Sequence, residues 1–197
     1  MNKRLKIGID LDDVVFDFIQ TILDFYLQEY NRVILFENVH TFQLDEIFNI
    51  SLEETMNLIK KMALEGLVEN MSLCKDAKES IYELSKDHDI YFITSRLVRD
   101  YTPESLDNNF GDIKFGLYYS SNPYVGTKGK TKGEICNELG IDLMIEDSRE
   151  HAEICARKGV KTFLLNKPWN KAYDLGENIK RVYNWKQVLE GIENGLH

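Results

Sequence analysis

The second half of the chain alternates between short apolar runs and amphipathic stretches, and this alternation restricts the fold more than any other feature. From residue 75 on, apolar runs at 90–93, 113–119, 141–145 and 160–165 are separated by stretches that have helical spacing or turn residues. Strands and helices in this rhythm form a parallel sheet covered by helices on both faces. With the apolar run at 5–9 as the first strand, the sequence predicts a doubly wound α/β domain.

The first half of the chain has a helical pattern instead. Apolar residues recur at helical spacing from Val14 to about Tyr30. Ser51, with Glu54 three residues later, predicts a capping box at the start of another helix. No strand pattern occurs between these helices, so we predict a helical cap inserted directly after the first strand. The predicted division is residues 1–14 and 75–197 for the α/β core and residues 15–74 for the cap.

Charge and cysteine content exclude several classes of function. The 197 residues carry a net charge of −9, and the only basic cluster is Lys128, Lys130 and Lys132. Binding to a nucleic-acid polymer or an anionic membrane normally needs a larger basic face. A small phosphorylated ligand needs only a few local cations and remains open. Three scattered cysteines and four scattered histidines predict a reduced, cytoplasmic protein without a zinc site.

Polar side chains follow the predicted strands directly. In chain order they are Asp10, Asp12 and Asp13 after the first strand, Thr94 and Ser95 after the second, Lys132 at the start of a later helix, and Glu146 and Asp147 after the strand that follows it. The carboxyl ends of parallel strands lie at one edge of the sheet, where such domains bind ligands. We therefore expect these acids, hydroxyls and lysine to converge on one site.

This combination of groups suits phosphoryl transfer. Clustered carboxylates repel one another unless a cation binds, and Mg²⁺ prefers carboxylates together with water and phosphate. A carboxylate beside the metal can attack phosphorus, and a second can transfer the proton. A lysine and a hydroxyl can neutralise and orient the phosphoryl oxygens.

Structural explanations compete at each position. Asp12 and Asp13 could cap the free amides after the strand, and Thr94 and Ser95 could cap the next helix. The lysine cluster could be a solvated loop in which Lys130 competes with Lys132 for any role at a site. Phe18 on an amphipathic helix could belong to the core. The histidines show no partner in the sequence and receive no role.

The order and spacing of these residues resemble the signatures of the haloacid-dehalogenase (HAD) phosphatases. Asp10-Leu11-Asp12-Asp13-Val14 resembles the first signature, Thr94 the second, Lys132 the third and Glu146-Asp147 the fourth. The resemblance implies a Rossmann-like core of the HAD type. It also implies that Asp10 is the nucleophile and a metal ligand, and that Asp12 is the general acid and base, with its backbone carbonyl touching the metal. Thr94 and Lys132 would hold phosphate, Asp147 would bind Mg²⁺ directly, and Glu146 would bind it through water.

A narrower resemblance is to the 5'(3')-deoxyribonucleotidases. It rests on Asp17-Phe18 after the first signature, on Thr94-Ser95 as a phosphate-binding pair, and on Pro168-Trp169-Asn170, which is similar to a segment of bacterial relatives. It implies that Phe18 stacks on a base, and Phe42 of the cap is a second candidate for substrate contact. Arg96 and Glu146 depart from the pattern, which commonly has proline and aspartate there.

The sequence therefore predicts a Mg²⁺-dependent phosphomonoesterase for a small phosphorylated metabolite, with a nucleoside or deoxynucleoside monophosphate as the favoured substrate. A phosphatase for sugar phosphates and a relative that binds phosphorylated ligands without catalysis are the alternatives. A receiver-type signalling domain needs an acceptor aspartate on a strand between Asp13 and Thr94, where the pattern is helical. The sequence carries no signal for an oligomeric state.

Overall fold

One parallel sheet organises the protein. The computed structural model describes residues 3–41, 43–97, 99–122, 125–171 and 174–195. Among them, six strands pair in the order β3-β2-β1-β4-β5-β6, and every neighbouring pair is parallel. The strands are β1 (Lys6–Ile9), β2 (Asp89–Thr94), β3 (Phe115–Tyr119), β4 (Leu143–Glu146), β5 (Lys161–Leu165) and β6 (Ile179–Val182). The predicted doubly wound parallel sheet is confirmed, and its strand order reverses between β1 and β4.

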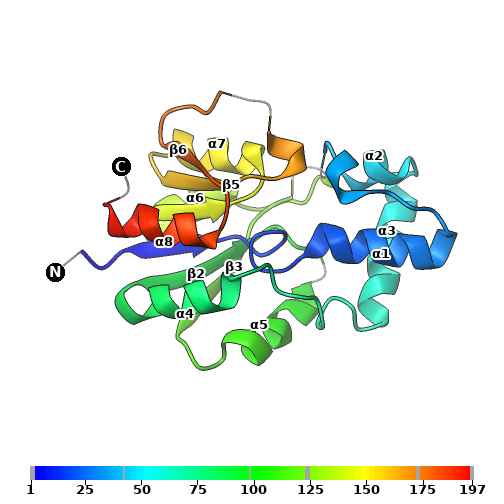
Figure 1. Ribbon diagram of the computed structural model, residues 1–197, viewed down its shortest axis with the longest axis horizontal. Coiled ribbons are helices and arrows are strands. Elements are labelled where there is room, and N and C mark those ends of the chain that lie inside the picture. The colour runs from blue at the N-terminus through cyan, green and yellow to red at the C-terminus, as the bar shows by residue number, and fades with distance from the viewer. Residues whose placement is uncertain (1–2, 42, 98, 123–124, 172–173, 196–197) are drawn as a thin grey trace.

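Helices cover both faces of this sheet (Figure 1). Neighbouring strand residues point to opposite faces, so Phe92 and Ile93 belong to two different apolar clusters. The cluster of Phe92 includes residues of α4 (Ala77–Asp87), α5 (Thr102–Phe110) and α8 (Trp185–Glu193). The cluster of Ile93 includes residues of α6 (Lys132–Leu139) and α7 (Arg149–Arg157). The sheet is therefore the middle layer of three.

Three further helices lie beyond one end of the sheet, on the side away from both chain termini (Figure 1). They are α1 (Phe18–Tyr30), α2 (Leu44–Phe48) and α3 (Leu52–Leu64). The capping box predicted for α3 is present, because Glu54 N donates to Ser51 Oγ at 3.2 Å and Ser51 N donates to Glu54 Oε2 at 2.8 Å. None of the described helices combines the length and apolar character needed to cross a bilayer.

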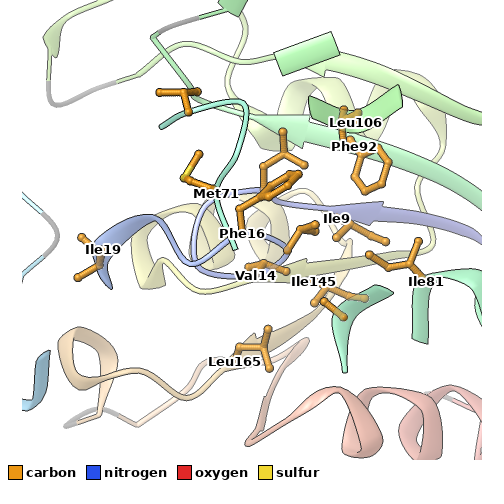
Figure 2. Packing of buried hydrophobic residues seen from close by; sticks show 14 of the residues in the cluster. Ile9, Val14, Phe16, Ile19, Met71, Ile81, Phe92, Leu106, Ile145 and Leu165 are labelled. Carbon is orange, nitrogen blue, oxygen red and sulfur yellow. The ribbon is translucent and has the colours of Figure 1, made fainter. Parts of the chain in front are cut away.

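The apolar core runs without a break from the sheet to these helices. Figure 2 shows Ile9 and Phe92 of the sheet packed near Leu106 of α5, with Phe16 and Ile19 continuing the cluster toward α1. Phe16 is fully buried, and its backbone pairs with that of Leu73. The division into a core and a cap at residues 14 and 75 stays a prediction.

The structure corrects the start of one predicted helix and adds three helices or strands. The helix expected from Val14 begins at Phe18. Asp13 takes a left-handed conformation with φ of 60°, and Phe16 N donates to Leu11 O at 2.9 Å, so the chain makes a compact loop there. Helices α2 and α5 and strand β6 were not predicted. Strand β6, Ile179–Val182, is short, and its two charged residues lie between its two apolar ones, so the segment shows no apolar run or alternation.

Candidate active site

The loop after β1 brings the first acids to the middle of the sheet edge. Asp10 N donates to Ile145 O at 3.0 Å, so Asp10 lies beside the carboxyl end of β4. Asp13 is an aspartate in the left-handed region, which this residue type tolerates better than most. Its carboxylate accepts from Ile19 N at 3.2 Å, in the first turn of α1. The loop is thereby held between the strand and the helix.

Lys132 provides the cation at the centre of the site. Thr131 caps α6 through a capping box with Glu134 and fixes the helix start. Lys132 Nζ then lies 2.7 Å from Asp10 Oδ1 and 2.9 Å from Glu146 Oε2, with its side chain only 2% exposed. Lys130, the competing lysine, lies at the surface and pairs with Glu138 at 2.6 Å. Of these two lysines, only Lys132 is brought to the strand ends.

Three buried carboxylates form a group that could hold a metal ion. Oxygen atoms of Asp10, Glu146 and Asp147 all lie within 4.8 Å of one another. Trp169 Nε1 donates to Asp147 Oδ2 at 2.9 Å, and Asn170 Nδ2 donates to Asp147 O at 2.7 Å, so this acid is held in place from the short helical turn Pro168–Asn170. Hard oxygen donors of this kind fit Mg²⁺.

Burial makes these acids hard to ionise without a cation. Burial and the charge of Glu146 raise the pKa of Asp10 to about 7, although Lys132 opposes the shift. Burial raises the pKa of Asp13 to about 8, with Lys167 opposing and Asp12 contributing. Burial, with Glu146 and Asp10, also raises the pKa of Asp147 well above its usual range. A bound divalent ion would favour the ionised forms.

We expect the metal-free protein to lose stability as the pH rises. Carboxyls with a raised pKa bind protons more tightly in the folded state, so their stabilisation is complete below about pH 4 and is lost as the pH passes about 7 to 8. The free energy of unfolding in chelator should fall by at least about 1.4 kcal/mol between pH 5 and pH 8.5, the equivalent of one pKa unit. Urea unfolding at both pH values measures it, and magnesium should reduce the fall. A free energy that rises with pH in chelator would contradict this account.

The strand ends open onto a cavity of about 450 Å³, within the range of small-molecule sites. Of the predicted residues, Asp10, Asp12, Lys132, Glu146 and Asp147 line it, and so do Ser95 and Phe18. The opposite wall comes from α2, α3 and the segment after α3 and is mainly apolar, although Asp45 and Thr55 of these helices also line it. Its apolar members are Leu44, Leu52, Met56, Ile59, Val68 and Met71. Phe18 is the one aromatic residue among the described lining residues, and Phe42 lies outside the described residues.

The two hydroxyl residues after β2 take different places. Thr94 is fully buried at the end of the strand, is not among the lining residues, and its Oγ1 accepts from Arg96 N at 3.2 Å. Ser95 lines the cavity, and its hydroxyl lies 2.7 Å from the hydroxyl of Ser120. The structure therefore brings Ser95 to the cavity wall, while Thr94 lies behind it.

Two cavity-lining residues contact acids of the site, although neither was assigned a role from the sequence. His151 was left without a partner, yet its Nδ1 lies 3.4 Å from Glu146 Oε1. Its position in the first turn of the helix after Glu146-Asp147 is the signal that could have found it. Arg96 was noted only as a departure from a family pattern, yet it contacts Asp12.

Comparison with known proteins identifies the family. The family described as 5' nucleotidase, deoxy (pyrimidine), cytosolic type C protein matches residues 3–194. The chain belongs to this nucleotidase family. A nucleotidase of Clostridium acetobutylicum is 30% identical over 194 residues, which cover 98% of this chain and 96% of that protein. YqfW of Bacillus subtilis, also named as a nucleotidase, is 27% identical over 197 residues, with 98% and 96% covered.

Solved structures place this nucleotidase-family chain in the HAD fold. A HAD-like hydrolase of Streptococcus pneumoniae, SP0104, aligns with a TM-score of 0.67 at 12% identity, covering 98% of this chain and all of that one. The HAD hydrolase YfnB of Bacillus subtilis, described with bound magnesium, aligns with a TM-score of 0.62 at 18% identity, covering 95% and 98%. At these identities the likeness concerns the fold. Family and fold together support a phosphatase of the nucleotidase type.

Proposed function

We propose that this protein is a Mg²⁺-dependent phosphomonoesterase that hydrolyses a nucleoside or deoxynucleoside monophosphate. One observation carries the proposal. Asp10, Lys132 and the acidic pair Glu146-Asp147 meet at a cavity whose far wall is mainly apolar. The family's description as a cytosolic nucleotidase supports the same activity and a cytoplasmic location. We also propose that residues 15–74 form a cap over the leaving group, because helices in this range supply the apolar wall.

The proposed reaction has two steps. A carboxylate oxygen of Asp10 attacks phosphorus, the bond from phosphorus to the ester oxygen breaks, and Asp12 gives its proton to the leaving alkoxide. Water then attacks the aspartyl phosphate, Asp12 takes the proton from the water, and phosphate leaves as Asp10 is regenerated. Lys132 and Ser95 would orient the phosphoryl oxygens, and Thr94, buried at the end of β2, would support Ser95.

Mg²⁺ bound by Asp10 and Asp147, with Asp12 contributing its backbone carbonyl and Glu146 acting through water, would neutralise phosphoryl charge. The fit rests on the chemistry of the three buried carboxylates. Trp169 would keep Asp147 oriented toward the ion through its indole hydrogen bond.

The cavity wall favours a nucleotide over a sugar phosphate. A base needs apolar and aromatic surface on its faces, and Phe18 with the aliphatic and methionine wall offers it. A sugar needs many hydrogen-bonding side chains. The polar side chains of Gln43, Asp45, Thr55 and Asn122 also line the cavity, and these would serve a sugar phosphate.

A substrate panel tests the proposal. We expect phosphate release from purified protein to be fastest with nucleoside or deoxynucleoside monophosphates, slower with sugar phosphates, and lost in chelator until magnesium is restored. Release that persists in chelator would rule out the metal-dependent reaction. A preference for sugar phosphates would reject the nucleotide assignment alone, and no release from any compound would favour a binding protein without catalysis.

A further inference from the structure

Arg96 is a buried cation at the cavity that the proposed reaction does not use. It lies two residues beyond the end of β2 and lines the cavity, and its side chain is only 3% exposed. Its guanidinium lies over the ring of Phe16, with Cζ 4.9 Å from the ring centroid. Its Nε donates to Asp12 Oδ1 at 2.7 Å. The ring of Phe16 and the carboxylate of Asp12 therefore hold the guanidinium in place.

The same guanidinium has hydrogen-bond donors that lack an acceptor among the described residues. Arginine has five N–H hydrogens, is always charged, and is rarely buried without acceptors. Nη2 lies 2.7 Å from Asp12 Oδ1, but neither Nη1 nor Nη2 makes a hydrogen bond of good geometry to any described residue, and both atoms are buried. A buried, charged fork with unused donors at a cavity wall indicates an anionic ligand.

The phosphoryl group is the anion that every phosphomonoester brings to this cavity. Arginine matches phosphate oxygens with two parallel donors. Six carboxyl groups line the cavity, from Asp10, Asp12, Asp13, Asp45, Glu146 and Asp147, whereas Lys132 is the one other lysine or arginine among the described lining residues. A second cation would therefore reduce the repulsion between these acids and a dianionic substrate.

We propose that Arg96 is a further substrate-binding residue that donates from its Nη nitrogens to a phosphoryl oxygen, while its Nε stays bonded to Asp12. The inference rests on the proposed function, since it assumes a phosphomonoester in the cavity. It goes beyond the family resemblance, in which this position is commonly proline. It also explains why an arginine is buried at a site rich in acids.

Binding of inorganic phosphate tests the inference without requiring turnover. Arg96→Met keeps an apolar stem over Phe16 and removes the donors. In the presence of magnesium, we expect calorimetry to give a Kd for phosphate about 10- to 100-fold higher than for the unmodified protein, the loss typical of a hydrogen bond to a charged group. KM should rise by a similar factor for every substrate, whatever its leaving group. Arg96→Gln is measured as well, so that the test can still be made if Arg96→Met does not fold.

Two controls separate contact from charge and from general damage. Arg96→Lys keeps the charge but loses the fork, so it should recover phosphate binding only in part. Arg4→Met removes an exposed arginine that pairs with Asp89 at 2.9 Å, and it should bind phosphate as the unmodified protein does. Unchanged phosphate binding in folded Arg96→Met or Arg96→Gln, or complete recovery in Arg96→Lys, would overturn the inference. So would a rise in KM confined to one leaving group. If the protein bound phosphate through Arg96 but hydrolysed no substrate, the proposed function would be rejected and the contact from Arg96 would be retained.

Discussion

Replacing Asp10 with asparagine is expected to reduce phosphate release by at least about 10⁴-fold, the scale seen when a covalent nucleophile is removed. Asparagine keeps the size of the side chain but is a far weaker nucleophile and a weaker metal ligand. It can still accept a hydrogen bond from Lys132 Nζ, which lies 2.7 Å from Asp10 Oδ1. The loss should therefore appear in kcat with a folded protein, and phosphate release under saturating substrate and magnesium measures it.

Trapping the intermediate adds a second measurement to this prediction. Acid quenching with substrate labelled in its phosphoryl group should leave label on the unmodified protein, and hydroxylamine should remove it, as expected for an acyl phosphate. Asp10→Asn should carry no label. Asp24→Asn, which alters an exposed aspartate of α1, serves as the control and should be labelled normally. Turnover in Asp10→Asn within ten-fold of the unmodified rate would remove Asp10 as the nucleophile.

The sheet and the strand-end residues could be predicted because they depend on local patterns. The capping box at Ser51 lies within a four-residue segment, and α3 begins where this box predicts. Asp10 and Asp147 directly follow apolar strands and Glu146 is the last residue of one, so parallel topology alone brings them to one edge. Such features need only short-range sequence and one rule of topology.

Contacts between distant segments could not be read in the same way. The hydrogen bond from Arg96 to Asp12 joins residues 84 positions apart, and that from Trp169 to Asp147 joins residues 22 apart. Neither has a periodic signal, because each depends on the direction of two loops. The predicted start of α1 was also wrong, because the helical spacing from Val14 does not reveal the left-handed backbone conformation of Asp13.

Replacing Lys132 with methionine is expected to lower the free energy of unfolding by about 3 to 5 kcal/mol in chelator at pH 8, as when one partner of a buried ion pair is removed. Lys132 Nζ contacts both Asp10 and Glu146, whose side chains are 9% and 0% exposed. Burial lowers the pKa of Lys132, but the two carboxylates outweigh this and raise it above its usual range. Methionine would fill the space and leave two buried acids without a counter-charge.

Conditions that neutralise those acids should restore the stability of Lys132→Met. Lower pH should do so because the carboxyls take up protons, and magnesium should do so because it replaces the lost positive charge. Lys130→Met is the matched control: this lysine lies two residues away, is 60% exposed and pairs with exposed Glu138, so its removal should change the free energy by no more than about 0.5 kcal/mol. Urea unfolding of both variants at pH 5.5 and pH 8, with chelator and with magnesium, gives the comparison. Equal stability of the two variants in chelator at pH 8 would mean that the buried acids are already protonated there, and Asp10 would then not be poised as an ionised nucleophile before the metal binds.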